Sequence, residues 1–145
     1  MTPRQARCVD CGATQMLLRT ALTVRRADTT EVIGNALIAK ANEVGHRTIA
    51  AAVDRPVSTV RRWLRRAGGD HPEWLRLRGV QPHTAQVDRD LLVRPAPQRT
   101  PLGHALNLLI GTAVRYRQVL AASYPVWSLI GRFTDGCVIA APRRT

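Results

Sequence analysis

The residues from Arg55 to Arg66 include five arginines and no acidic residue. The five are Arg55, Arg61, Arg62, Arg65 and Arg66. Guanidinium groups pair strongly with phosphate oxygens and, in the major groove of DNA, with guanine. A row of such groups without carboxylates beside it is suited to a polyanion. The alternative is a solvated helix face whose charge is incidental, and the absence of acids on the same face favours binding.

A second candidate site lies near the N-terminus. Cys8, Cys11 and the following Gly12 have the spacing of one half of a zinc ribbon. A structural zinc needs four ligands, and Cys137 lies at the other end of the sequence. We therefore expect no cofactor, with a zinc site shared between two copies of the chain as the alternative. Apart from His46, at the entry to the second predicted helix, the histidines are expected on the surface or in loops: His71, His83 and His104.

The acidic residues give no support to a catalytic site. A metal-dependent transposase or nuclease needs two or three carboxylates that converge on the metal. The carboxylates that follow the arginine row lie in no recognisable strand: Asp70, Glu73, Asp88, Asp90 and Asp135. Neither a glycine-rich phosphate loop nor a serine, histidine and aspartate spacing is present. We expect that the protein is not an enzyme.

Three predicted helices position the arginines. The first is expected to begin with Asp28 as N-cap and Glu31 at its third position, and to end at Gly45 as a left-handed residue. A second short helix follows, with Ala50 at the point where it crosses the third. Its inward residues are Ile49, Ala50 and Val53.

The third helix has one narrow apolar face, because four apolar residues recur at helical spacing. They are Val60, Trp63, Leu64 and Ala67. Ser58 or Thr59 is expected to cap this helix after the turn that contains Asp54. If the apolar face turns inward, Arg55 from the turn joins an outward set made of Ser58, Thr59, Arg61, Arg62, Arg65 and Arg66.

The segment from Ile49 to Leu64 resembles the helix-turn-helix of bacterial transposases and Hin-type recombinases, many of which begin the recognition helix with serine, threonine and valine. The whole chain is similar to a family of small zinc-ribbon-like helix-turn-helix proteins of high-GC bacteria. The resemblance implies that Ser58 and Arg62 read bases. It assigns the DNA backbone to Arg61, Arg65 and Arg66. Asp54 stands where the family usually has glycine, and aspartate tolerates the left-handed conformation.

The sequence therefore predicts a mainly α fold in four parts. Residues 1–27 form a short cysteine-bearing hairpin like a truncated zinc ribbon, and residues 28–69 form the three-helix unit. Residues 70–100 contain a short helix, capped by Asp70 with Glu73, and a proline-rich linker. Residues 101–145 are helical, with Thr100 as cap, a second helix through Arg132, and a hint of a strand near Cys137.

Composition agrees with a nucleic-acid partner. The 145 residues include 22 basic and 10 acidic ones, which gives a net charge of +12, and the sequence pI is near 11.5. Only 4% are aromatic, which argues against stacking on single-stranded bases. We expect no secretory signal and no membrane helix, and thus a cytoplasmic, nucleoid-associated protein.

We expect sequence-specific binding of double-stranded DNA, as a transcriptional regulator or as part of a mobile element. The alternative is a helical protein-interaction module with incidental positive charge. The apolar stripe of the C-terminal segment must pack on the unit or on a partner, so a homodimer is possible.

Overall fold

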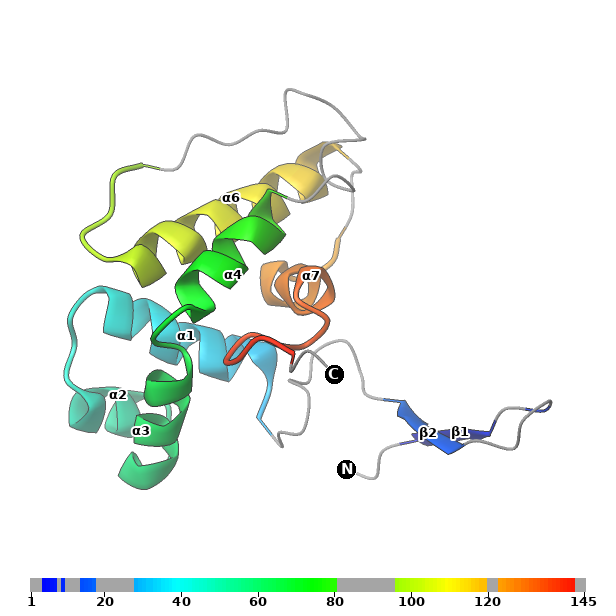
Figure 1. Cartoon of the computed structure of the whole chain (residues 1–145), viewed down its shortest axis with the longest axis horizontal. Helices are drawn as coiled ribbons and strands as arrows, with labels where there is room; N and C mark the ends of the chain where they lie inside the picture. The colour runs from blue at the N-terminus through cyan, green and yellow to red at the C-terminus, as the bar shows by residue number, and fades with distance from the viewer. Residues whose placement is uncertain are drawn as a thin grey trace.

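The computed structural model describes residues 4–7, 9, 14–17, 28–80, 96–119 and 123–142. Most of these residues are helical, so the predicted mainly α fold is confirmed (Figure 1). The helices are α1 (Thr30–Ala41), α2 (His46–Ala52), α3 (Val57–Arg66), α4 (His71–Gly79), α6 (Pro101–Val119) and α7 (Val126–Phe133).

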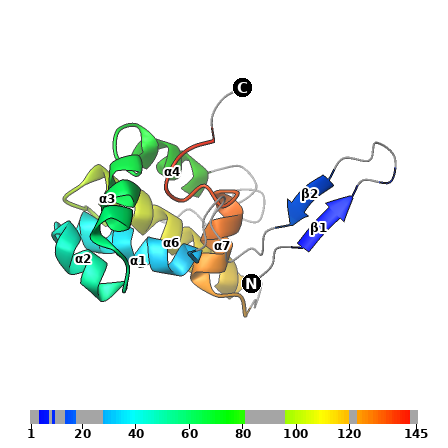
Figure 2. The same ribbon diagram turned by 90° about the horizontal axis from the view of Figure 1, so that it is seen from below.

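A two-stranded antiparallel hairpin precedes the helices. Strand β1 (Arg4–Arg7) pairs with β2 (Thr14–Leu17), and Arg7 lies opposite Thr14. The hairpin stands to one side of the helical body in both views (Figures 1 and 2). A hairpin in this part of the chain is what the sequence predicts.

The N-cap of α1 lies one residue later than expected. Thr29 is the N-cap, and its hydroxyl accepts a hydrogen bond of 3.3 Å from the backbone N–H of Val32. The prediction of Asp28 as cap is wrong, because Thr29 has the extended backbone that a cap requires, with φ −70° and ψ 155°. The Asp28 carboxylate is thereby left to bond elsewhere.

The end of α1 also differs from expectation. Glu43, rather than Gly45, takes the left-handed conformation, with φ 63°. Gly45 has φ −67° and is the N-cap of α2. The chain therefore takes its left-handed residue at Glu43, two residues before the N-cap of α2.

Helix α1 lies at the centre of the helical body. It contacts α2 and α3 on one side and α6 and α7 on the other (Figure 1). The C-terminal helices therefore pack on the three-helix unit of the same chain, which is one of the two arrangements that the apolar stripe allowed. One hydrophobic cluster joins both parts: Ile33, Ala36, Leu37, Ile49, Ala50, Val60, Trp63, Ala67, Leu75, Ala105, Leu106, Leu109, Ala113, Leu129, Ile130, Phe133, Val138 and Ile139.

Glycine allows α1 and α7 to meet closely. A Cβ built on Gly34 would overlap the six-membered ring of Trp127, so the indole lies directly against the backbone of α1. Gly79 similarly permits α4 to approach α6, where a Cβ would lie 3.0 Å from Cγ of Leu108. The Thr112 hydroxyl donates to the Gly79 carbonyl at 3.2 Å and fixes this second contact.

The C-terminal segment confirms some local predictions and overturns others. Thr100 accepts from the Gly103 N–H at 3.0 Å, and α6 begins at Pro101, as expected. Residues 137–141 form bends and irregular backbone rather than a strand. Asp70 precedes α4 but makes no side-chain cap, so the capping box with Glu73 is wrong.

His71 anchors the segment that follows α7. Its side chain is only 5% exposed, its Nε2–H donates to the Val138 carbonyl at 2.8 Å, and its ring stacks on Trp74. The expectation of a surface histidine is wrong. Within the part of the chain that the structure describes, Nδ1 has no hydrogen-bond partner. Burial therefore lowers the pKa of His71, and the bond to Val138 opposes that shift only in part.

We expect Gly34→Ala to destabilise the fold by about 1–3 kcal/mol, because the new methyl group overpacks the contact with Trp127. The measurement is urea unfolding. The same substitution in a Trp127→Leu background should cost less, since the smaller side chain leaves room. Gly68→Ala is the control, because Gly68 is exposed and an added Cβ would lie 3.4 Å from the carbonyl oxygen of Arg65, an ordinary van der Waals contact.

We expect the free energy of unfolding to fall as the pH drops from about 7 to about 5. The unfolded chain binds a proton at the ordinary histidine pKa of 6.5, whereas folded His71 binds it only at a lower pH. Unfolding curves across this range should lose much of that dependence in His71→Gln and keep it in His104→Gln, a change on the exposed side of α6. Equal pH dependence in both variants would contradict the assignment.

Candidate nucleic-acid interface

Helix α3 is fixed in rotation by three buried side chains. Val60, Trp63 and Ala67 are at most 1% exposed. Trp63 belongs to the fully buried core, so the expected inward orientation of its indole is confirmed. Leu64, which was expected on the same face, is only half-buried. The buried stripe is therefore narrower than the sequence pattern indicates.

The opposite face of α3 is polar and open to solvent. Its exposed residues are Ser58, Arg61, Arg62, Arg65 and Arg66, and we call this set the arginine face. Thr59 was expected with them but is half-buried at the border of the stripe. Neither Ser58 nor Thr59 caps the helix, because Pro56 is the N-cap and both residues lie inside the first turn. The Ser58 side chain thus projects from the helix rather than folding back onto it.

The four guanidinium groups of the arginine face have no carboxylate partner among the residues that the structure describes. Among residues 28–80, 96–119 and 123–142, no carboxylate forms an ion pair with any of them. Arginine keeps its charge throughout the physiological pH range. Four cations within about one and a half turns of one helix create a strong local positive potential, which attracts an anionic partner.

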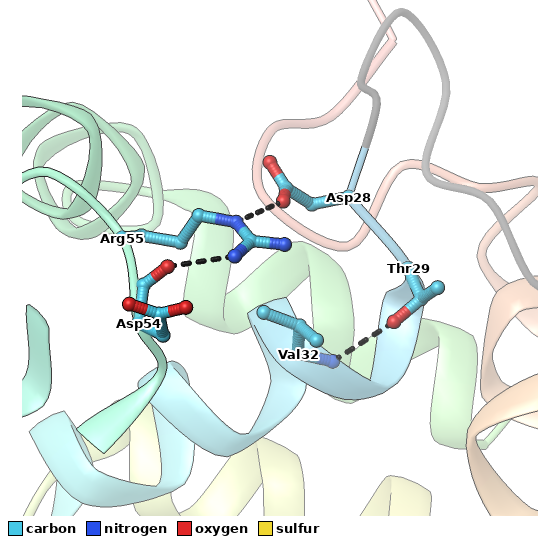
Figure 3. Close-up of polar contacts among 5 residues, drawn as sticks. All are labelled: Asp28, Thr29, Val32, Asp54 and Arg55. Carbon is cyan, nitrogen blue, oxygen red and sulfur yellow. Dashed lines mark hydrogen bonds and ion pairs between the residues drawn. The ribbon is translucent and has the colours of Figure 1, made fainter. Parts of the chain in front are cut away.

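Arg55 behaves differently from the other arginines. Its Nε donates to Oδ1 of Asp28 at 2.6 Å, and Nη1 donates to the backbone carbonyl of Asp54 at 2.6 Å (Figure 3). The bond to Asp28 and its charge raise the pKa of Arg55 above the ordinary value. The prediction that Arg55 joins the outward set is therefore not supported by its geometry: the side chain links the start of α1 to the turn before α3.

The turn between α2 and α3 depends on one left-handed residue. Asp54 has φ 51°, as the sequence argument allowed. The N–H of Arg55 then bonds to the Ala50 carbonyl at 3.0 Å, which closes the end of α2. Three hydrogen bonds from Arg55, two through its side chain and one through its backbone, thus hold the turn. This turn sets the angle at which α3 leaves α2.

Two features of the candidate interface were not predicted from the sequence: the exposed Arg47 and the pairing of Asp28 with Arg55. Arg47 is exposed in the first turn of α2 and, within the described residues, pairs with no carboxylate. Its outward position follows from the inward Ile49 and Ala50, so the pattern contained the signal. The partnership of Asp28 with Arg55 had no such signal, because 27 positions separate the two residues.

The structure leaves the zinc prediction open. Cys8 and Cys11 lie outside the described residues. Within the described part, no group of three or more histidine, cysteine, aspartate or glutamate side chains is arranged to hold a metal. Cys137 is half-buried in the segment after α7, where burial raises the pKa of its thiol.

An open depression of about 510 Å³ lies between the starts of α4 and α6. Several of its titratable groups are engaged in hydrogen bonds. Glu73 accepts two hydrogen bonds from Arg76, which lower the pKa of its carboxyl, and His104 accepts from the backbone N–H of Gln98. The carboxylate of Asp70 lines the same depression beside the ion pair of Glu73 and Arg76.

Comparison of the chain with protein families, with curated proteins and with solved structures finds no match. Function must therefore be inferred from the side chains themselves. None of the helices in the described ranges is both long and apolar enough to cross a bilayer. The feature that distinguishes the surface is the arginine face of α3.

We expect Asp28→Asn and Arg55→Gln each to lower the urea midpoint of unfolding, because each removes the ion pair that holds the turn. The double variant should be little worse than either single one, since both remove the same interaction. Arg99→Gln is the matched control, because its pair with Glu43 is highly exposed and longer, at 3.6 Å. Additive losses from Asp28 and Arg55 would show that the two side chains act independently.

Proposed function

We propose that this protein binds double-stranded DNA in a sequence-specific manner, with α3 in the major groove. The observation that carries the proposal is the arginine face: four exposed guanidinium groups without a carboxylate partner in the described residues, opposite a buried tryptophan. A helix with its side chains is about 10–12 Å wide, and the major groove is about 12 Å wide. The helix thus fits the groove, and its charge fits the phosphate walls.

The arrangement around α3 supports the same proposal. Helices α1, α2 and α3 contact one another, and a short turn of residues 53–56 joins the last two. In a helix-turn-helix the second helix of such a pair enters the groove while the first crosses the backbone. Arg47 on α2 is exposed and suited to a phosphate on that path.

A duplex fits better than single-stranded nucleic acid. Binding to single strands relies on exposed rings on which bases stack. Trp63 is buried in the core, and Trp74 is covered by the His71 ring and the Arg78 guanidinium. The surface of α3 presents cations and a hydroxyl instead of rings. We propose a non-enzymatic role as a regulator or as the DNA-binding protein of a mobile element, inside the cytoplasm.

We expect the affinity for duplex DNA to fall steeply with salt, because each phosphate neutralised by the protein contributes a slope of about −0.9 in log affinity against log salt. The measurement is fluorescence anisotropy with a labelled duplex at several salt concentrations. Arg61→Gln and Arg66→Gln should each weaken binding to all sequences and reduce the slope by about 0.9.

Arg132→Gln is the matched control, since Arg132 is an exposed arginine on α7, outside the α2 and α3 pair. It removes the same charge from the chain and should leave the affinity unchanged. If Arg132→Gln weakens binding as much as Arg61→Gln, only the total charge matters. If the wild-type chain does not bind duplexes, the arginines have no role in DNA binding. That result would favour the alternative of a helical protein-interaction module.

A further inference from the structure

We infer that Arg65 and Ser58 face the base edges of the groove, whereas Arg61, Arg62 and Arg66 face the phosphates. The inference rests on the proposed function and deepens it, because it names the side chains that determine specificity. It also differs from the assignment that the family resemblance implies, in which Arg62 reads a base and Arg65 does not.

The buried stripe defines the direction in which α3 faces the protein. Successive residues of an α-helix are rotated by about 100°, so Trp63 lies about 60° from Val60 and Ala67 about 20° from it, both on the same side. All three are almost completely buried. Their mean direction points to the core, and the opposite direction points away from the protein.

Two side chains lie on that outward direction. By the same rotation, Ser58 and Arg65 are within about 15° of it, whereas Arg61 and Arg62 lie about 50° to either side. Arg66 lies at about 90°, along the flank of the helix. A helix that enters a groove with its outward side toward the floor therefore presents Ser58 and Arg65 to the bases. The other arginines point toward the two walls.

The burial of Leu64 and Thr59 decides between Arg62 and Arg65. If Leu64 counts as fully inward, the stripe shifts toward it, and Arg62 and Arg65 become equally outward. In the structure Leu64 is only half-buried, and Thr59, on the other border of the stripe, is half-buried as well. The stripe is thus displaced away from Leu64. This displacement moves the outward direction from midway between Arg62 and Arg65 toward Arg65.

The chemistry of the two residues suits base recognition. A guanidinium group can donate two parallel hydrogen bonds to O6 and N7 of guanine, and a serine hydroxyl can contact several bases. Within the described residues, no carboxylate forms an ion pair with Arg65. Seven positions separate Ser58 from Arg65, about 10 Å along the helix axis. This distance corresponds to about three base-pair steps of 3.4 Å.

The experiment is selection of bound duplexes from a random pool, followed by affinity measurements on the preferred site. We expect the full wild-type chain to prefer guanine at one position. Arg65→Lys keeps the charge but loses the bidentate geometry, so the preference for that guanine should fall by about 5- to 150-fold while the salt slope stays the same. Arg62→Lys is the matched variant and should retain the preference.

Ser58→Ala adds a test of geometry, because it should relax a base pair about three steps from the guanine lost in Arg65→Lys. Circular dichroism checks that each variant keeps its helices. If Arg62→Lys abolishes the guanine preference and Arg65→Lys does not, the assignment of the bases is overturned while DNA binding stands. Uniform, salt-dependent binding to all duplexes overturns this assignment and also the sequence specificity of the proposed function, while DNA binding itself stands. Failure to bind any duplex instead contradicts the proposed function itself.

Discussion

Burial of Trp63 is the constraint on which the surface chemistry of this protein depends. The indole is the largest fully buried side chain in the described core, and with Val60 and Ala67 it allows only one rotation of α3 about its axis. Every outward side chain of α3 follows from that rotation. The arginine face is therefore a consequence of core packing, which fixes the helix positions from which the arginines project.

Helix α1 transmits this rigidity to the rest of the chain. It contacts α2 and α3 on one side and α6 and α7 on the other, so one element supports both the proposed DNA-binding helices and the C-terminal helices. The close contact of Gly34 with Trp127 and the bond from His71 to Val138 tighten the same body from its far side. The C-terminal segment thus belongs to the support of α3.

The ion pairs divide the arginines into two groups. Arg55 uses its guanidinium to connect the start of α1 with the turn before α3, and Arg76 binds Glu73 on α4. The arginines of α3 have no such partner in the described residues. A paired guanidinium holds a backbone in place, whereas an unpaired one retains its donors for a ligand. Charge counted from composition does not separate these roles, because the separation depends on which carboxylate lies near.

The sequence by itself determined the helices and the inward turn of Trp63, because helical periodicity is a local property that the spacing of apolar residues records directly. It also determined that four arginines lie away from that face. Only the tertiary structure decided that Thr29 caps α1, that Arg55 binds Asp28, that His71 is buried, and that Arg65 rather than Arg62 lies opposite the core. The cap, the ion pair and the burial of His71 depend on backbone geometry or on contacts between distant residues. The orientation of Arg65 depends on how deeply Leu64 is buried. Spacing along the chain does not contain that information, because packing against other helices supplies it.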